Sequence, residues 1–131
     1  MRVLVVDDDL NVAEPLLAFL DAEGFDTGFA RHASEALPLA ERFKPDLALV
    51  DIGLPGTDGW QLGRLLREIP GLDDLPIIAV TGNGTPEDFR RSLDAHFQHH
   101  LVKPTDYSRL LEILRAHEAL LANWKQHRAG S

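Results

Sequence analysis

The chain has 131 residues, which suffice for one domain of ordinary size but not for two. It carries 13 Lys and Arg against 21 Asp and Glu, and the resulting formal charge of −8 argues against nucleic acids and anionic membranes as partners. The sequence contains no cysteine, which excludes disulfides, thiolate nucleophiles and cysteine-ligated metals, and no apolar run approaches the roughly 18 residues of a membrane span.

The first part of the chain predicts three strands separated by two helices. Residues 3–6 are continuously apolar, which is typical of a parallel strand buried on both faces. A helix with one apolar face follows and stops at Gly24. Residues 27–30 predict a weaker edge strand, and a second helix begins behind Ser34, the expected N-terminal cap. Residues 47–50 form the next continuously apolar strand.

The second part of the chain continues the alternation. A third helix is expected from near Asp58, followed by an apolar strand at residues 77–80. The fourth helix has the clearest start, with Thr85 as its cap and a proline in its first position. A short strand at residues 101–102 and a fifth helix from near Asp106 complete the pattern.

Strands that alternate with helices predict one α/β domain with a flavodoxin-like, doubly wound parallel sheet. For five strands joined by right-handed crossovers, the expected order is 2-1-3-4-5, with five helices. No repeat or linker divides the chain. We expect the domain to span residues 1–122, with residues 123–131 forming an extension of the last helix and a frayed tail.

Polar residues follow the predicted strands at the end of the sheet where open α/β folds place their sites, beside the point where strand order reverses. The first strand ends in an acidic triplet that includes Asp7 and Asp8, and the third strand ends in Asp51. The fourth and fifth strands end in Thr81 and Lys103. We therefore expect these carboxylates, one hydroxyl and one ammonium group to converge.

This set of groups has a specific chemical use. Crowded carboxylates repel one another, and a hard cation such as Mg²⁺ relieves the repulsion while it keeps open coordination positions. A carboxylate beside such an ion can attack phosphorus and carry an acyl phosphate. An ammonium group and a hydroxyl can then contact the remaining phosphoryl oxygens. Asp9, the third residue of the triplet, is expected only to cap the following helix.

Four segments containing these residues resemble the receiver domain of two-component response regulators. The resemblance runs from residue 2 to about residue 122, with the segments in the family's order. It is closest to single-domain receivers and to receivers attached to hybrid sensor kinases. The segments are Val5-Val6-Asp7-Asp8-Asp9, residues 50–59, Ile78-Ala79-Val80-Thr81-Gly82 and Leu101-Val102-Lys103-Pro104.

The resemblance implies a phosphorylation-activated response regulator. Asp51 would accept a phosphoryl group from a histidine kinase or a histidine phosphotransfer protein, and Thr81 and Lys103 would contact it. The domain would catalyse only its own phosphorylation and dephosphorylation, and it would signal to a protein target without a DNA-binding output domain. A cytoplasmic location and a phosphorylation-dependent homodimer are further expectations.

The resemblance also implies a magnesium site. Asp8 would bind Mg²⁺ directly, Asp7 would help through water, and Asp51 and the backbone carbonyl of Gly53 would complete the protein ligands. The peptide bond between Lys103 and the following proline is expected to be cis.

Three positions depart from the family's commonest pattern. The switch position three residues before Lys103 is often aromatic but here holds His100, which we expect to act with Thr81. His96 stands at the end of the fourth helix, where glycine commonly provides a positive φ. Gly53 offers no side chain to shield an acyl phosphate at Asp51.

Other conspicuous residues are expected to have structural roles. The spacing of His96, His99 and His100 does not suit a helix face, and no neighbouring carboxylate completes a metal triad, so we do not expect a transition-metal site. Trp60 and Trp124 fall on predicted helices, where they would serve packing or an interaction surface.

Two other functions remain open from the sequence. A pseudo-receiver would use the same fold as an inert interaction module. A flavodoxin-like flavin binder would need a loop rich in Ser, Thr and Gly after the first strand, whereas the acidic triplet there would repel a cofactor phosphate. The stretch of residues 97–104 is closer to hybrid-kinase receivers, while Met1 directly before the first strand favours a native start.

Overall fold

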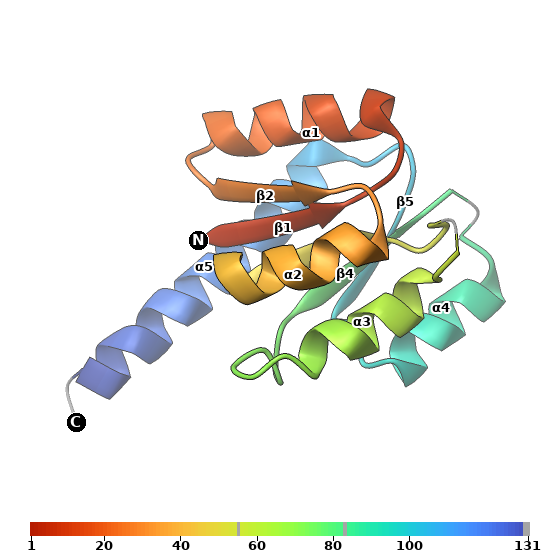
Figure 1. Cartoon of the computed structure of the whole chain (residues 1–131). Coiled ribbons are helices and arrows are strands. Elements are labelled where there is room, and N and C mark those ends of the chain that lie inside the picture. The colour runs from red at the N-terminus through yellow and green to blue at the C-terminus, as the bar shows by residue number, and fades with distance from the viewer. Residues whose placement is uncertain (55, 83, 130–131) are drawn as a thin grey trace.

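Five parallel strands form one sheet in the order β2-β1-β3-β4-β5, which confirms the predicted doubly wound flavodoxin-like fold (Figure 1). The computed structural model describes residues 1–54, 56–82 and 84–129, with side chains through residue 124. The strands are β1 (Arg2–Val6), β2 (Asp26–Ala30), β3 (Leu47–Asp51), β4 (Ile77–Thr81) and β5 (His99–Val102). The helices are α1 (Leu10–Ala22), α2 (Ala33–Phe43), α3 (Gly59–Arg67), α4 (Pro86–Asp94) and α5 (Tyr107–Ala129).

Helices cover both faces of the sheet, and the core is accordingly divided into two layers. In Figure 1, α1 and α5 lie on one side of the strands, and α2, α3 and α4 lie on the other. Successive side chains of a strand point to opposite faces, so each buried strand contributes to both layers. Val3 and Val5 of β1 pack in the layer of α1 and α5, whereas Leu4 and Val6 pack in the other. The continuously apolar strands are thus explained by burial on both faces.

A cap residue is described for four of the helices, and in three of them its side chain accepts a capping hydrogen bond. Asp9 accepts a hydrogen bond from the Asn11 backbone N–H, and Asp58 and Thr85 cap α3 and α4. The roles of Asp9 and Thr85 were predicted correctly. Each cap fixes where its helix begins, and therefore how the loop that follows the preceding strand ends.

The prediction that Ser34 caps the second helix is wrong. The helix α2 begins at Ala33, and His32 occupies the cap position without a side-chain capping hydrogen bond. Burial of Ala36 and Ala40 against the sheet sets the position of α2. A cap is worth only about 1 kcal/mol, so packing can place a helix start at a residue that caps poorly.

The end of α4 has the positive φ that the sequence position suggested. His96 has φ 59°, a conformation that costs a residue with a side chain about 1–2 kcal/mol. The guanidinium of Arg67 in α3 donates to the backbone carbonyls of Ala95 and His96 at 2.7 and 2.8 Å. These charge-assisted bonds hold the turn in place of the usual glycine.

The connection from β3 to α3 passes very close to the backbone of the third strand. A Cβ atom at Gly59 would lie 2.7 Å from Ile52 Cα and 2.8 Å from the Asp51 carbonyl oxygen. Only glycine permits this approach. The first turn of α3 therefore packs directly behind the end of β3, which carries Asp51.

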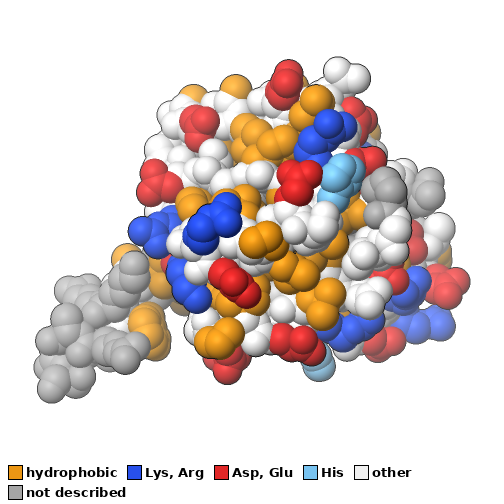
Figure 2. Space-filling view, viewed as in Figure 1, with side chains coloured by type: hydrophobic (Ala, Val, Ile, Leu, Met, Phe, Trp, Pro, Cys, Tyr) orange, Lys and Arg blue, Asp and Glu red, His pale blue; other side chains and the backbone are white. Residues whose placement is uncertain are grey.

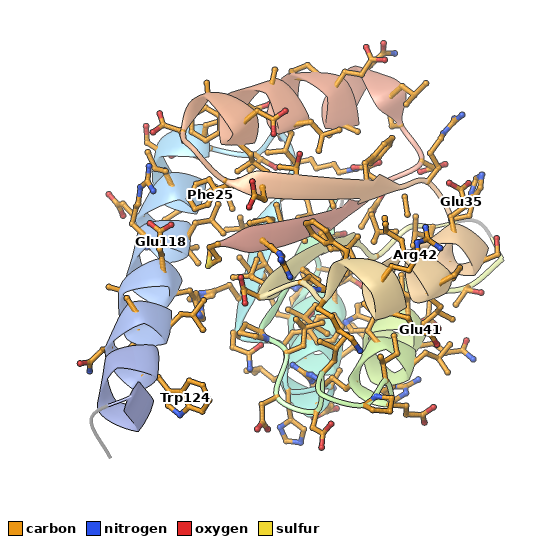
Figure 3. All side chains as sticks on the ribbon, turned by 60° about the vertical axis from the view of Figure 1, so that its left-hand side comes forward. Phe25, Glu35, Glu41, Arg42, Glu118 and Trp124 are labelled. Atoms are coloured by element: carbon orange, nitrogen blue, oxygen red, sulfur yellow. The ribbon has the colours of Figure 1, made fainter. Side chains whose placement is uncertain are left out.

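The last helix continues past the sheet. Figure 3 shows Trp124 on the part of α5 that extends beyond the strands, and this side chain is 56% exposed. Trp124 and Leu120 line a surface groove of about 570 Å³ together with Met1 and Pro76, at the end of the sheet opposite to the acidic residues. No helix in the described part of the chain is long and apolar enough to cross a membrane.

A pair of histidines joins β5 to α5 and makes stability depend on pH. The Nε2 atoms of His99 and His117 lie 3.4 Å apart. Burial lowers the pKa values of His99, His117 and His100, so the folded protein binds these protons less readily than the unfolded chain. The contribution of these neutral rings to stability is complete above the unfolded pKa of about 6.5. It is lost as the pH falls through the lowered pKa values of the folded protein.

We therefore expect the free energy of unfolding in urea to be about 1 kcal/mol lower near pH 5.5 than near pH 7.5, a figure kept small because these rings are partly solvated. The His117→Gln protein should show a smaller difference than the wild type. The matched variant His32→Gln alters an exposed residue and should behave as the wild type. Equal pH dependence in all three proteins would contradict this prediction.

Candidate functional site

The predicted site residues lie at the carboxyl ends of four neighbouring strands. Asp7 follows β1, Asp51 ends β3, Thr81 ends β4 and Lys103 follows β5. Strand alternation explains part of this convergence: Val5 and Leu49 pack in the α1 and α5 layer, so Asp7 and Asp51, two residues further along, lie on that same face.

The three predicted carboxylates come together. Asp7, Asp8 and Asp51 each place a carboxylate oxygen within 4.8 Å of the others. Asp7 and Asp51 are 4% and 7% exposed, whereas Asp8 is half-buried. Figure 2 shows the other acidic side chains of the visible face dispersed over the surface. Asp7, Asp8 and Asp51 therefore gather only part of the negative charge of the chain, but they place it close enough together to hold a metal ion.

Backbone N–H groups orient two of these carboxylates. The Asp9 N–H donates to Asp7 Oδ1, and the Gly53 N–H donates to Asp51 Oδ1, both at 2.9 Å. The Oδ1 atom of each carboxylate is thus bonded within its own loop, and its Oδ2 atom faces Lys103. Arg31 donates to the backbone carbonyl of Asp8 at 3.0 Å and so holds the loop that follows β1.

Lys103 lies between the two buried carboxylates. Its Nζ is 3.1 Å from Asp7 Oδ2 and 3.2 Å from Asp51 Oδ2. The peptide bond from Lys103 to Pro104 is cis, as predicted, and the Lys103 backbone N–H donates to the Thr81 carbonyl at 2.7 Å. The lysine therefore continues the β4–β5 pairing and supplies the positive charge that the carboxylates need.

The pKa values reflect burial and pairing in opposite ways. Burial raises the pKa of Asp7, and the Asp51 charge raises it further, against the lowering effects of the Asp9 N–H and Lys103. Burial tends to lower the pKa of Lys103, but the hydrogen bonds and charges of Asp7 and Asp51 outweigh it and raise that pKa. The lysine is thus held charged, and its two carboxylates share one cation.

This donor set fits Mg²⁺. Three converging carboxylate oxygens are ligands of the kind that this ion prefers, and the cluster carries more negative charge than Lys103 neutralises. Gly53 lies beside Asp51 and is exposed, and a Cβ atom there would be 3.6 Å from Asp51 Oδ1. The coordination by the Gly53 carbonyl stays a prediction.

The two predicted switch residues lie on neighbouring strands. Thr81 is 5% exposed at the end of β4. His100 pairs in register with Ala79, so Thr81 and His100 lie on the same face of the sheet, two residues apart in register. His99 points to the other face, toward His117 of α5, and His96 is exposed beyond α4. The three histidines do not converge.

Sequence reasoning missed one buried polar residue near the site. Ser92 of α4 is 3% exposed and bonds both Trp60 of α3 and His100 of β5. Trp60 itself is buried, as the packing role predicted. A serine within a helix gives no distinguishing pattern in a single sequence. Its partners become visible only when α3, α4 and β5 are placed together.

A doubly wound sheet with three carboxylates, a lysine and a threonine at its carboxyl edge defines the receiver class of signalling domains. Residues 3–115 match the family model of the response regulator receiver domain, and the chain belongs to that family. It is therefore a receiver domain of the two-component response regulators.

Similar proteins support this assignment. An uncharacterised 14.6 kDa protein of Leptolyngbya boryana is 37% identical over 88% of both chains. The DNA-binding response regulator MtrA of Mycobacterium tuberculosis is 36% identical over 88% of this chain, which spans about half the length of that protein.

Solved structures agree with the fold. A CheY-like receiver domain protein from Methanospirillum hungatei has a TM-score of 0.82 and 31% identity, with 95% of this chain and 97% of that chain covered. The receiver domain of sensor histidine kinase PA1611 from Pseudomonas aeruginosa, with a magnesium ion coordinated in its active site cleft, has a TM-score of 0.79 and 30% identity. That comparison covers 88% of this chain and 94% of the other.

Proposed function

We propose that this domain accepts a phosphoryl group on Asp51 and changes conformation in response. The observation that carries the proposal is the convergence of three carboxylates with Lys103, because such a cluster is costly unless cation binding or phosphoryl transfer uses it.

The proposed step is a displacement at phosphorus. An oxygen of Asp51 attacks the phosphorus of a phosphohistidine, an oxygen–phosphorus bond forms, the nitrogen–phosphorus bond breaks, and the donor imidazole leaves with the bonding pair. Mg²⁺, held by Asp8, Asp51 and the Gly53 carbonyl with help from Asp7, would neutralise phosphoryl charge when bound. Hydrolysis of the acyl phosphate later restores the carboxylate.

The other polar residues hold the transferred group. Lys103 is already 3.2 Å from Asp51 Oδ2, so its ammonium group needs little movement to contact a phosphoryl oxygen there. Thr81 would donate its hydroxyl to another oxygen and, with His100, report the new state to the surface. Gly53 leaves the acyl phosphate accessible to water.

The partners follow from this chemistry. The phosphoryl donor would be a histidine kinase or a histidine phosphotransfer protein in the cytoplasm, and the output would be a protein target, with phosphorylation-dependent homodimerisation as one form of response. The receiver unit would span residues 1–122, and residues 123–131 would extend it.

Intact-mass spectrometry tests the proposal directly. The protein should gain one phosphate adduct from acetyl phosphate with Mg²⁺ and none when EDTA removes the metal, and peptide mapping should place the adduct at Asp51. An adduct that forms equally in EDTA, or at another residue, would contradict the proposal. The absence of any adduct would instead support the alternative, a pseudo-receiver interaction module.

A further inference from the structure

A buried hydrogen-bonded chain of side chains connects α3, α4 and β5. The indole Nε1–H of Trp60 donates to Ser92 Oγ at 3.0 Å, and Ser92 Oγ lies 2.7 Å from His100 Nδ1. Trp60 is 4% exposed and Ser92 is 3% exposed. We call these three residues the latch. None of these three residues belongs to the acidic cluster of Asp7, Asp8 and Asp51.

The latch leaves one polar atom unsatisfied. Burial lowers the pKa of His100, against the opposing charge of Asp88, so the ring is neutral near pH 7. The Trp60 indole can only donate, so Ser92 Oγ accepts from it and either donates to His100 Nδ1 or accepts from it. In both tautomers the buried His100 Nε2 has no partner among the described residues.

An unsatisfied buried nitrogen makes this position of His100 conditional. In this position the ring bonds Ser92 while Nε2 has no partner within the described part of the chain. A position that leaves a buried nitrogen without a partner is less stable than one that satisfies both ring nitrogens, so little additional free energy is needed to displace the ring.

The outer side of the latch reaches the surface of α4. The ring of Phe89, which is 41% exposed, stacks on His100 with centroids 4.1 Å apart and an angle of 24°. The guanidinium of Arg91 lies 3.9 Å from the centre of a Trp60 ring and 3.5 Å from an Asp58 oxygen. Movement of His100 therefore changes what α4 presents to solvent.

We propose that Ser92 and Trp60 are positioning residues that hold His100, and with it α4, in the resting state, and that occupation of the phosphorylation site opens the latch. This inference rests on the proposed function for its trigger. The route is short, because Thr81 lies on the face of the sheet that carries His100, two residues further in register.

The test uses nuclear magnetic resonance with fluoroberyllate and Mg²⁺ as the probe of the phosphorylated state. The Gly53 amide reports binding at Asp51, the Trp60 indole reports the latch, and the Trp124 indole, at the far end of α5, serves as an internal control. We expect the probe to shift the Gly53 amide and the Trp60 indole, to change the nitrogen shifts of His100, and to leave Trp124 unchanged.

The Ser92→Ala protein separates the latch from the site. Its Trp60 indole should already be shifted without the probe, and the probe-induced change there should fall at least about twofold while the Gly53 amide responds as in the wild type. Ser34→Ala, an exposed serine on α2, is the matched control and should behave as the wild type. If Ser92→Ala does not fold, Trp60→Phe keeps an aromatic side chain, removes the indole donor and should alter the His100 nitrogen shifts.

The outcomes are distinguishable. A Gly53 amide that does not respond contradicts the proposed function and removes the trigger of the latch with it. A Gly53 amide that responds while the Trp60 indole and the His100 nitrogens stay unchanged contradicts the latch alone. An undiminished Trp60 response in Ser92→Ala also overturns it.

Discussion

The Asp51→Asn protein is expected to gain no phosphate adduct from acetyl phosphate and Mg²⁺, a loss of at least about 100-fold, while it remains folded. An amide oxygen is a poor nucleophile toward phosphorus, so the chemistry stops. The fold survives because asparagine keeps an oxygen to accept the Gly53 N–H, and because Lys103 keeps its bond to Asp7 at 3.1 Å.

Two measurements check this expectation together. Intact-mass spectrometry quantifies the adduct, and urea denaturation should give a free energy of unfolding within about 1 kcal/mol of the wild type. The control Asp26→Asn removes an exposed carboxylate at the start of β2 and should leave phosphorylation intact. Retention of the adduct by Asp51→Asn would show that another group is the acceptor.

The Lys103→Met protein is expected to lose about 3 kcal/mol of stability in EDTA and to regain much of it when Mg²⁺ is added. Lys103 is the cation between Asp7 and Asp51, whose side chains are 6% and 9% exposed. Without it, two buried carboxylates face each other with no cation between them, and a divalent cation becomes the remaining means of neutralising them.

Urea denaturation of both proteins, each in EDTA and in Mg²⁺, measures the effect. The stabilisation by Mg²⁺ should be larger in Lys103→Met than in the wild type, because in the wild type the lysine already neutralises part of the charge. Lys44→Met alters an exposed lysine after α2 and should change neither quantity. Equal Mg²⁺ stabilisation in wild type and Lys103→Met would show that the lysine and the ion do not share these carboxylates.

The fold was predictable because its signals are local and mutually consistent. Continuously apolar runs such as residues 47–50 occur where a strand is covered on both faces, and strict alternation with helices leaves few possible topologies. The acidic site was predictable for the same reason, since Asp7 and Asp51 end strands whose adjacency follows from the topology.

What the sequence left undetermined depends on contacts between distant segments. The start of α2 follows the packing of its alanines and not the capping preference of Ser34. The buried role of Ser92 depends on an indole 32 residues away, and the pairing of His99 with His117 spans 18 residues. The ammonium group of Lys103 lies between two carboxylates, and the place of this residue after a strand could not indicate that geometry.

The bonds that Arg67 makes have a mechanical consequence for α4. Its guanidinium donates to the carbonyls of Leu75, Ala95 and His96 and to the Gln98 side chain, so the segment just after α4 is fastened to α3 and to the loop before β4. The opposite end of α4 follows β4 after a short loop and is capped by Thr85. We therefore expect a displacement of α4 that is driven from β4 to be larger at the amino end of the helix than at its fastened carboxyl end.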